Sequence, residues 1–257
     1  EFSLTEGDAY NKFAINYSRD SIRALNFFSE VDVKEIRTEF PDKINLEISV
    51  EEKNTGEASL GAGYSSASST SLNIGLKETN FLGKGQKLNL TSSFSSTRNT
   101  YDIAYTEPYF NNKQLALTGS IYSNFTDPTS ANYETEDLGL GLKAQFPVGP
   151  NTNLETRYSL FTAKVKADTN ATAYERLLAG TDTNSTIGYS INYDKRNSRY
   201  KPSSGFIFEI DQDLAGIGGT SYYVKNRLSY SAYKRLSDRL IGAIKFQAGN
   251  SNGYNGK

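Results

Sequence analysis

The sequence of 257 residues contains no cysteine, histidine, methionine or tryptophan, and these absences narrow the range of functions. Without cysteine there is neither a disulfide framework nor a thiolate metal site. Without histidine, the commonest general base and the commonest metal ligand are both missing. The carboxylates follow no calcium-binding spacing, and the glycine-rich stretches lack the helix or lysine that phosphate binding needs. We therefore expect no enzymatic activity, no metal site and no cofactor.

The chain also lacks an excess of positive charge and a long hydrophobic run. Its formal net charge is −1 and its pI about 5.8, so no basic field exists to attract nucleic acid. No stretch of about 18 apolar residues occurs, so we expect no membrane-spanning helix. Because the chain opens on Glu1 without a signal peptide, we expect it to be an internal piece of a longer, exported protein.

What the sequence does contain is an alternation of apolar and polar side chains at every second position. Leu138, Leu140 and Leu142, for example, alternate with two glycines and a lysine. A two-residue period predicts strands that have one apolar and one polar face. We expect eleven such strands, at residues 56–65, 70–79, 86–97, 99–109, 113–125, 133–146, 152–165, 185–194, 204–214, 221–235 and 239–249.

The composition agrees with strands that cross a membrane. Hydrophobic residues make up only 37% of the chain, yet it has 18 Tyr and 14 Phe. A transmembrane barrel combines a polar lumen with aromatic rims, and a bilayer permits no open sheet edge. We therefore predict a mainly β protein whose fold is a transmembrane antiparallel β-barrel, incomplete in this chain. The alternative is a soluble β-sandwich with one wet face.

Charged residues within the predicted strands fall on one parity of the alternation. Glu155 and Arg157 share a parity in one strand, and Asp211 and Asp213 do so in another. A charge on the lipid face at mid-depth costs up to about 2–4 kcal/mol. We therefore expect these side chains to face an aqueous lumen.

The connections between the predicted strands differ in length. Tight ones follow even-numbered strands, as at Asn80–Gly85, Asn111–Asn112 and Pro147–Asn151, whereas the long segment Lys166–Ser185 follows an odd-numbered strand. Bacterial barrels have short periplasmic turns and longer external loops, so the N-terminal segment is predicted to lie in the periplasm. Closed bacterial barrels have an even number of strands, and so we expect further strands beyond these eleven.

The first 53 residues follow a different pattern. Apolar residues recur at helical spacing up to Asn26, a residue that tolerates the left-handed conformation at a helix C-terminus. Two short alternating segments follow, joined by a turn at Pro41–Asp42. We predict a small α+β module with a hairpin, Val31–Phe40 and Ile44–Glu51.

The first predicted barrel strand is poor in bulky side chains. Ala58, Gly61, Ala62 and Gly63 give it little packing, and glycine weakens strand interiors. At a barrel seam, such a strand would leave backbone donors and acceptors available to a strand of another chain. The alternative is a glycine kink that relieves crowding or sharpens curvature.

The segment between the eighth and ninth predicted strands is a candidate structured turn. Pro202 and Gly205 are turn-forming residues, and Asp194 is placed to pair with Arg196 or Arg199. The simplest interpretation is a periplasmic turn held by a salt bridge.

Five segments, taken in order along the chain, also carry a family resemblance. They are Leu25–Val31 with Phe27 and Phe28, where Asn26 replaces the usual glycine; the junction formed by Glu52–Gly56 and then Gly61–Tyr64; the turn Asn80–Gly85; the strand end Glu107, Pro108, Tyr109 and Phe110; and the set Asp194, Arg196, Pro202 and Gly205. Together they resemble the outer-membrane β-barrel insertases, a family in which POTRA domains precede the barrel.

The resemblance implies an architecture for the whole protein. Residues 1–53 would form a POTRA domain that lacks its first strand, and residues 54–257 the N-terminal part of an outer-membrane barrel of about sixteen strands. The POTRA part would lie in the periplasm and the barrel in the bacterial outer membrane.

The resemblance also implies a function, the assembly and insertion of β-barrel proteins in the outer membrane. A lateral gate would use the strand that contains Gly56, Ala58, Leu60, Gly61, Gly63 and Tyr64. Implied partners are unfolded outer-membrane protein clients, accessory outer-membrane lipoproteins, lipid and lipopolysaccharide. The alternatives are an autotransporter-assembly or two-partner-secretion transporter of the same superfamily, or a passive outer-membrane pore.

Overall fold

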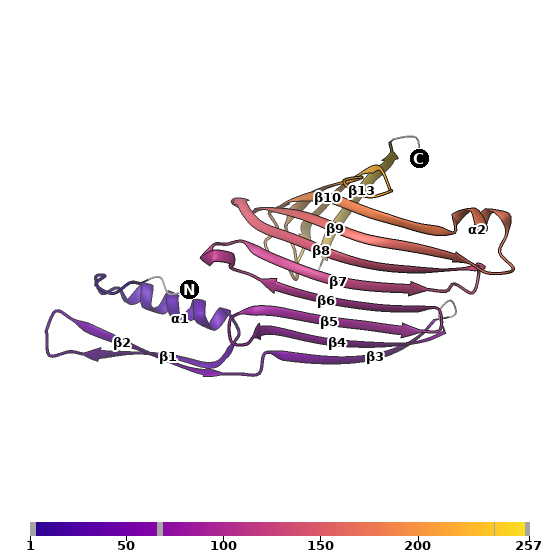
Figure 1. Ribbon diagram of the computed structural model, residues 1–257. Helices are drawn as coiled ribbons and strands as arrows, with labels where there is room; N and C mark the ends of the chain where they lie inside the picture. The colour runs from indigo at the N-terminus through magenta and orange to yellow at the C-terminus, as the bar shows by residue number, and fades with distance from the viewer. Residues whose placement is uncertain (1–3, 66–68, 239, 255–257) are drawn as a thin grey trace.

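The computed structural model describes residues 4–65, 69–238 and 240–254. It contains a short helix and a two-stranded hairpin, followed by a curved antiparallel sheet of eleven strands in sequence order (Figure 1). The eleven predicted strands are confirmed. They are β3 (Gly56–Ser65), β4 (Ser69–Phe81), β5 (Gln86–Ser95), β6 (Arg98–Glu107), β7 (Ala116–Thr126), β8 (Tyr133–Gly149), β9 (Thr152–Ala167), β10 (Gly180–Asp194), β11 (Gly205–Ala215), β12 (Tyr223–Ser237) and β13 (Leu240–Gly253).

The N-terminal module consists of helix α1 (Lys12–Ala24) and the hairpin β1 (Phe28–Arg37) and β2 (Ile44–Glu52). The Asn11 side chain caps α1 by accepting from two backbone N–H groups at 3.0 and 3.2 Å. The helix ends at Ala24, close to the predicted Asn26, which follows the C-cap Leu25 and has a left-handed φ of 61°. Ile15 of α1 and Val31 of β1 are buried, and the Arg23 guanidinium donates to the Val31 carbonyl at 2.8 Å. The assignment of this module as a POTRA domain stays a prediction.

Several predicted element boundaries differ from those of the structure. Strand β10 begins at Gly180 instead of residue 185, and the preceding segment contains a short helix, α2 (Ala173–Leu178). Strand β6 ends at Glu107, because Pro108 and the 3₁₀ turn η1 (Phe110–Asn112) follow it.

Pro147 was also misplaced, since it lies inside β8 and not in the turn after it. The last pair between β7 and β8 is Ala116 with Gln145, so Pro147 has no β7 partner and its missing N–H breaks no bond to that strand. The length rule for the connections also has exceptions, because residues 96–97 alone separate β5 from β6, whereas residues 195–204 join β10 to β11 on the side of the tight turns.

The strand register sorts the side chains of the sheet into two faces. One row across five strands contains Tyr105, Gly119, Leu142, Tyr158 and Ile187, and it lies on the convex face. The row contains large apolar side chains that are left uncovered, as shown by Leu142, which is 64% exposed. Among the described residues, the only buried hydrophobic side chains are Ile15, Val31, Ala171 and Ala215.

This distribution contradicts the soluble-sandwich alternative, because no second layer covers the apolar face. Substantial contacts between elements of the described ranges join neighbouring strands, α1 with β1, and α2 with β9. The fold is therefore that of a membrane β-barrel wall, open between β3 and β13 in this chain.

Aromatic pairs lie on the convex face towards both ends of the strands. Phe81 contacts Tyr105 at the end near the N-terminal module, and Phe94 contacts Tyr101 at the opposite end, with ring centroids 6.5 and 5.5 Å apart. Tyr and Phe thus occupy the positions expected of aromatic rims.

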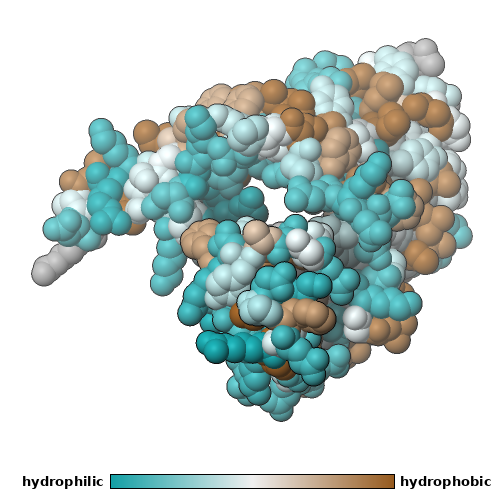
Figure 2. All heavy atoms as spheres, turned by 90° about the vertical axis from the view of Figure 1, so that its left-hand side faces the viewer, coloured by the Kyte–Doolittle hydropathy of each residue, from teal (hydrophilic) through white to brown (hydrophobic). Residues whose placement is uncertain are grey.

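The concave face is polar, as predicted from the parity of the charged residues, although Glu78 and Glu107, near the end at which the module lies, are on the convex parity. A concave row contains Lys87, Thr106, Thr118, Lys143 and Arg157. Seen from the end at which the module lies, the wall curves around a hollow that hydrophilic residues largely border (Figure 2). In the part of the chain that the structure describes, no helix has the length and apolar character needed to cross a membrane.

Candidate functional site

Strand β3, the predicted gate strand, lies at an edge of the sheet and pairs only with β4 within the described ranges. All ten of its residues are exposed. Leu60 and Tyr64 point to the convex side and are 76% and 81% exposed, the smaller Ala58 shares their parity, and Gly61 and Gly63 face the concave side. An edge strand of this kind presents a row of backbone N–H and C=O groups.

Side-chain hydrogen bonds add little to the backbone pairing between β3 and β4. The Ser59 hydroxyl is 3.5 Å from the Gly75 carbonyl, and the Ser71 hydroxyl is 3.4 Å from the Gly63 carbonyl, both long for O–H···O bonds. A Cβ at Gly61 would have its nearest neighbour, the Cβ of Asn73, 3.9 Å away. Gly61 therefore relieves no crowding in this chain, which argues against the glycine-kink alternative at that position.

The contacts at the junction between the module and the sheet involve mainly β4 and the turn after it. The Thr55 hydroxyl donates to the Glu78 carboxylate of β4, and the other carboxylate oxygen lies 3.0 Å from the position of a Cβ at Gly56. The Phe27 ring lies against the turn after β4, 3.5 Å from the position of a Cβ on Gly85. The sequence pattern singled out Phe27 and Phe28, whose rings form an edge-on pair at 6.4 Å, but gave no signal for Glu78.

The turn between β10 and β11 is held by the predicted ion pair. The Arg196 guanidinium binds the Asp194 carboxylate in a two-pronged arrangement, at 2.9 and 2.8 Å, whereas Arg199 is 3.8 Å away and its side chain is 76% exposed. Gly205 has a φ of 93°, and a Cβ there would overlap the Lys195 carbonyl oxygen. The turn therefore requires glycine at that position.

Three further residues of this turn, Asn197, Ser203 and Ser204, were not predicted from the sequence. The Asn197 side-chain oxygen accepts from the N–H groups of Ser203 and Ser204, both at 3.0 Å, and its amide donates to the Ser203 hydroxyl at 2.8 Å. These bonds hold the chain on either side of Pro202. The signal available in the sequence was an asparagine inside a proline-containing turn, where asparagine side chains often bond nearby backbone.

The strand end at Pro108, Tyr109 and Phe110 lies on the same end of the sheet as the module (Figure 1). The Glu107 carboxylate accepts from Gln86 Nε2 at 2.8 Å and from the Tyr109 N–H at 3.2 Å. The Phe110 N–H donates to the Leu115 carbonyl at 2.9 Å, which closes the turn.

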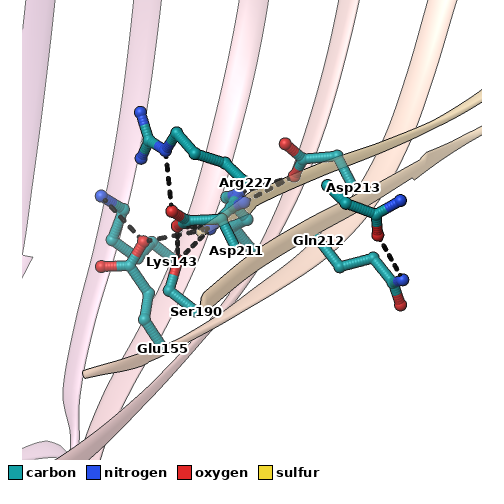
Figure 3. Close-up of polar contacts among 9 residues, drawn as sticks. Lys143, Glu155, Ser190, Asp211, Gln212, Asp213 and Arg227 are labelled. Carbon is teal, nitrogen blue, oxygen red and sulfur yellow. Dashed lines mark hydrogen bonds and ion pairs between the residues drawn. The ribbon is translucent and has the colours of Figure 1, made fainter. Parts of the chain in front are cut away.

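A polar cluster on the concave wall joins strands β8 to β12 (Figure 3). Arg157 is 2.7 Å from Asp213 and 2.6 Å from the Ser190 hydroxyl, and Arg227 is 2.9 Å from Asp211. The cluster borders a cavity of about 530 Å³ open to the hollow. Its lining residues are Lys143, Gln145, Asn153, Glu155, Arg157, Ser190, Asn192, Glu209, Asp211, Asp213, Lys225 and Arg227.

Gly188 explains how Arg157 reaches Asp213 across an intervening strand. Arg157 of β9 and Asp213 of β11 both pair with Gly188 of β10. A Cβ at Gly188 would overlap the Asp213 carboxylate and lie 3.1 Å from the Arg157 guanidinium. The contact between Arg157 and Asp213 therefore links β9, β10 and β11 by side chains, in addition to the backbone hydrogen bonds between these strands.

The cluster balances positive and negative groups, so it creates no strong field of one sign. Within the described ranges no group of three or more Asp, Glu, His or Cys side chains is placed to hold a metal ion. The side chains of the cluster can hold neighbouring strands together by ion pairs, and they can form hydrogen bonds with a polar solute.

The chain is similar in sequence to a family of known proteins. The model of the Omp85 superfamily domain matches residues 80–257. The outer membrane protein assembly factor BamA of Nitratidesulfovibrio vulgaris is 26% identical over 246 residues, which cover 94% of this chain and 31% of that protein. BamA of Neorickettsia risticii is 25% identical over 260 residues, covering 100% of this chain and 35% of that protein.

A solved structure supports the fold. The crystal structure of BamA from Haemophilus ducreyi lacking POTRA domains 1-3 matches with a TM-score of 0.85 and 22% identity, covering 100% of this chain and 52% of that one. The chain spans about a third of the length of the two BamA relatives.

Proposed function

Because the chain belongs to the Omp85 superfamily, we propose that the protein assembles and inserts β-barrel proteins into the bacterial outer membrane, with β3 as one side of a lateral gate. The observation that carries this proposal is the contrast at β3. It is an edge strand whose residues are all exposed, whereas the wall from β8 to β12 is cross-linked by charged side chains.

The gate would act by backbone pairing and not by a chemical step. A client strand that lies antiparallel to β3 would satisfy the N–H and C=O groups on its free edge, as in β-augmentation. Inside a membrane each unpaired backbone group is costly. Exchange of one strand for another, bond by bond, therefore needs little free energy at any step, because each bond that breaks is replaced by a similar one.

The membrane placement follows from the same proposal. The uncovered convex face, with side chains such as Leu138 and Ile121, would contact lipid in the outer membrane. The N-terminal module would lie in the periplasm, where its hairpin could meet unfolded clients or accessory outer-membrane lipoproteins. Lipopolysaccharide would lie around the opposite end of the wall.

Cross-linking in cells tests the gate, and residues 1–257 contribute no cysteine that would compete with an introduced one. A Leu60→Cys variant of the intact protein would be paired with a client that carries one cysteine in its terminal strand. Ile121→Cys is the matched control, since Ile121 also faces outward but lies in β7, paired with Ile103 and Leu140 on both sides.

The proposal expects a disulfide-linked adduct with Leu60→Cys and none with Ile121→Cys. Absence of the adduct while the client accumulates unfolded would remove the gate assignment. Equal adducts at both positions would show proximity without selective pairing, and would contradict it as well.

The polar concave face is the observation that favours the second candidate, a passive pore. A pore would give a high and steady single-channel conductance in planar bilayers. An assembly factor is expected to give low or fluctuating conductance and to restore barrel assembly in depleted cells.

A further inference from the structure

The convex face contains an apolar groove near the end at which the N-terminal module lies. Its volume is about 530 Å³, and it extends over β6 to β10. Two register rows build it, one through Tyr105, Gly119, Leu142 and Tyr158, and the other through Glu107 and three smaller or aliphatic residues, Leu117, Ala144 and Thr156.

The groove exists because small side chains lie between large ones. A Cβ on Gly119 would meet nothing closer than Leu142 Cδ2, at 4.0 Å. Gly119, Ala144 and Thr156 form the floor, and the rings of Tyr105 and Tyr158 stand on either side. On a membrane-facing wall, a groove of this shape accommodates an acyl chain.

A carboxylate lies at the rim of the groove. Glu107 follows Tyr105 on the same outward parity and also lines the groove, together with Phe110 of the adjoining turn. Its two hydrogen-bond partners, Gln86 Nε2 and the Tyr109 N–H, are neutral. Within the described ranges no Lys or Arg forms an ion pair with Glu107, so its negative charge is not neutralised by the protein.

We propose that this groove is a binding site for a phospholipid with a primary-amine headgroup. The ammonium group would donate to Glu107, which has lone pairs left after its two bonds. The Tyr105 and Phe110 rings beside it suit a cation over an aromatic face. One acyl chain would lie over Gly119 and Ala144. The inference depends on the outward face meeting lipid and not on the assembly activity.

Native mass spectrometry of the intact protein, taken from nanodiscs, tests the site with three lipids. Phosphatidylethanolamine has a primary ammonium, phosphatidylcholine has a quaternary ammonium without N–H donors, and phosphatidylglycerol has a net negative charge. We expect phosphatidylethanolamine to be retained roughly tenfold more than either of the others, as suits a charge-assisted hydrogen bond.

Two variants separate the headgroup from the groove. Glu107→Gln removes the charge and should reduce the retention of phosphatidylethanolamine to that of phosphatidylcholine. Gly119→Leu fills the floor and should lower the retention of all three lipids, and its Cβ meets only an ordinary contact with Leu142 Cδ2 at 4.0 Å. Controls are Asp127→Asn, in the connection after β7, and Ala232→Leu, on the convex face of β12.

Heat-modifiable migration on gels identifies the folded variants that enter the comparison. Equal retention of the three lipids by the unsubstituted protein would overturn the proposal. So would a Glu107→Gln variant that keeps the preference, or an Ala232→Leu control that loses lipid as Gly119→Leu does. Assembly of clients in cells can persist or fail independently of these results, so the two proposals fail separately.

Discussion

Two regions of the sheet, β9 to β12 and β3 to β5, share the same backbone ladder but differ in what their side chains add. Between β9 and β12, Arg157, Asp211, Asp213 and Arg227 bind across strands at distances down to 2.7 Å. Around β3, β4 and β5 no ion pair joins one described strand to another. The side-chain cross-links lie away from β3, and we therefore expect β3 to separate from its neighbour more easily than the cross-linked strands β9 to β12 do.

The largest expected effect on stability is that of replacing Gly205, in the turn between β10 and β11, compared with replacing Gly61 in β3. Gly205→Ala should lower the free energy of unfolding by at least about 2 kcal/mol, because the left-handed φ and the Lys195 carbonyl both oppose a Cβ. Gly61→Ala should change it by less than about 0.5 kcal/mol, since its Cβ would make only an ordinary van der Waals contact, 3.9 Å from the Cβ of Asn73. Urea unfolding in lipid vesicles, followed by circular dichroism, measures both. A Gly61→Ala cost as large as that of Gly205→Ala would contradict the comparison.

Removal of the central cation of the concave cluster is expected to be the next largest effect. Arg157→Gln leaves Asp213 and the Ser190 hydroxyl without their shared donor, and should cost about 1.5–3 kcal/mol, the range for hydrogen bonds to charged groups. Lys77→Gln is the matched control on the concave face of β4, where the described residues give Lys77 no ion pair. The same urea titration compares them, and equal midpoints would show that the cluster adds no stability.

A smaller effect is expected at the junction beside β3. Glu78→Gln weakens the bond from Thr55, which should cost about 1 kcal/mol and loosen the module relative to the sheet. Spin labels at Ser49→Cys and Lys84→Cys report the distance between the hairpin and the β4–β5 turn. The account expects a broader distance distribution in Glu78→Gln, while Glu57→Gln, on the concave face of β3, should leave it unchanged.

The smallest effect concerns the loop before β10, far from both regions. The Glu175 carboxylate accepts from the Thr172 N–H at 2.7 Å and from the Asn132 N–H at 3.1 Å, and these bonds lower its pKa from 4.5 to about 2. Its contribution is therefore complete above the unfolded pKa of 4.5 and is lost only as pH falls through about 2.

Amide protection at Thr172 and Asn132 should persist at pH 4 as at pH 7, after correction for the intrinsic exchange rate. In Glu175→Gln both amides should exchange faster at either pH. Loss of protection near pH 4.5 in the unsubstituted protein would contradict the lowered pKa.

The sheet could be predicted from the sequence because its signal is local. Leu138, Leu140 and Leu142 show their common face by their spacing alone, and Asn26 marks the end of α1 by its own conformational tolerance. The order of the strands then follows from short connections. Helix α2 was missed because its six residues lie in a polar segment with too few turns to show a helical period.

The cross-strand contacts could not be predicted, because they depend on register. Nothing in the sequence places Arg157 opposite Asp213, since the contact needs β10 between them and Gly188 at the crossing point. The bond between Thr55 and Glu78 likewise joins residues 23 positions apart. The parity of the charged residues indicated a polar face. It did not indicate which charged residues contact one another.

Hydrogen exchange of the intact protein in lipid nanodiscs tests the central claim most directly, by comparing the backbone amides of β3 with those of β11. The account predicts that β3 exchanges on the order of a hundredfold faster, because local opening begins at the strand without side-chain cross-links. Equal protection of the two strands would contradict the claim that β3 is held less firmly than the cross-linked strands of the wall.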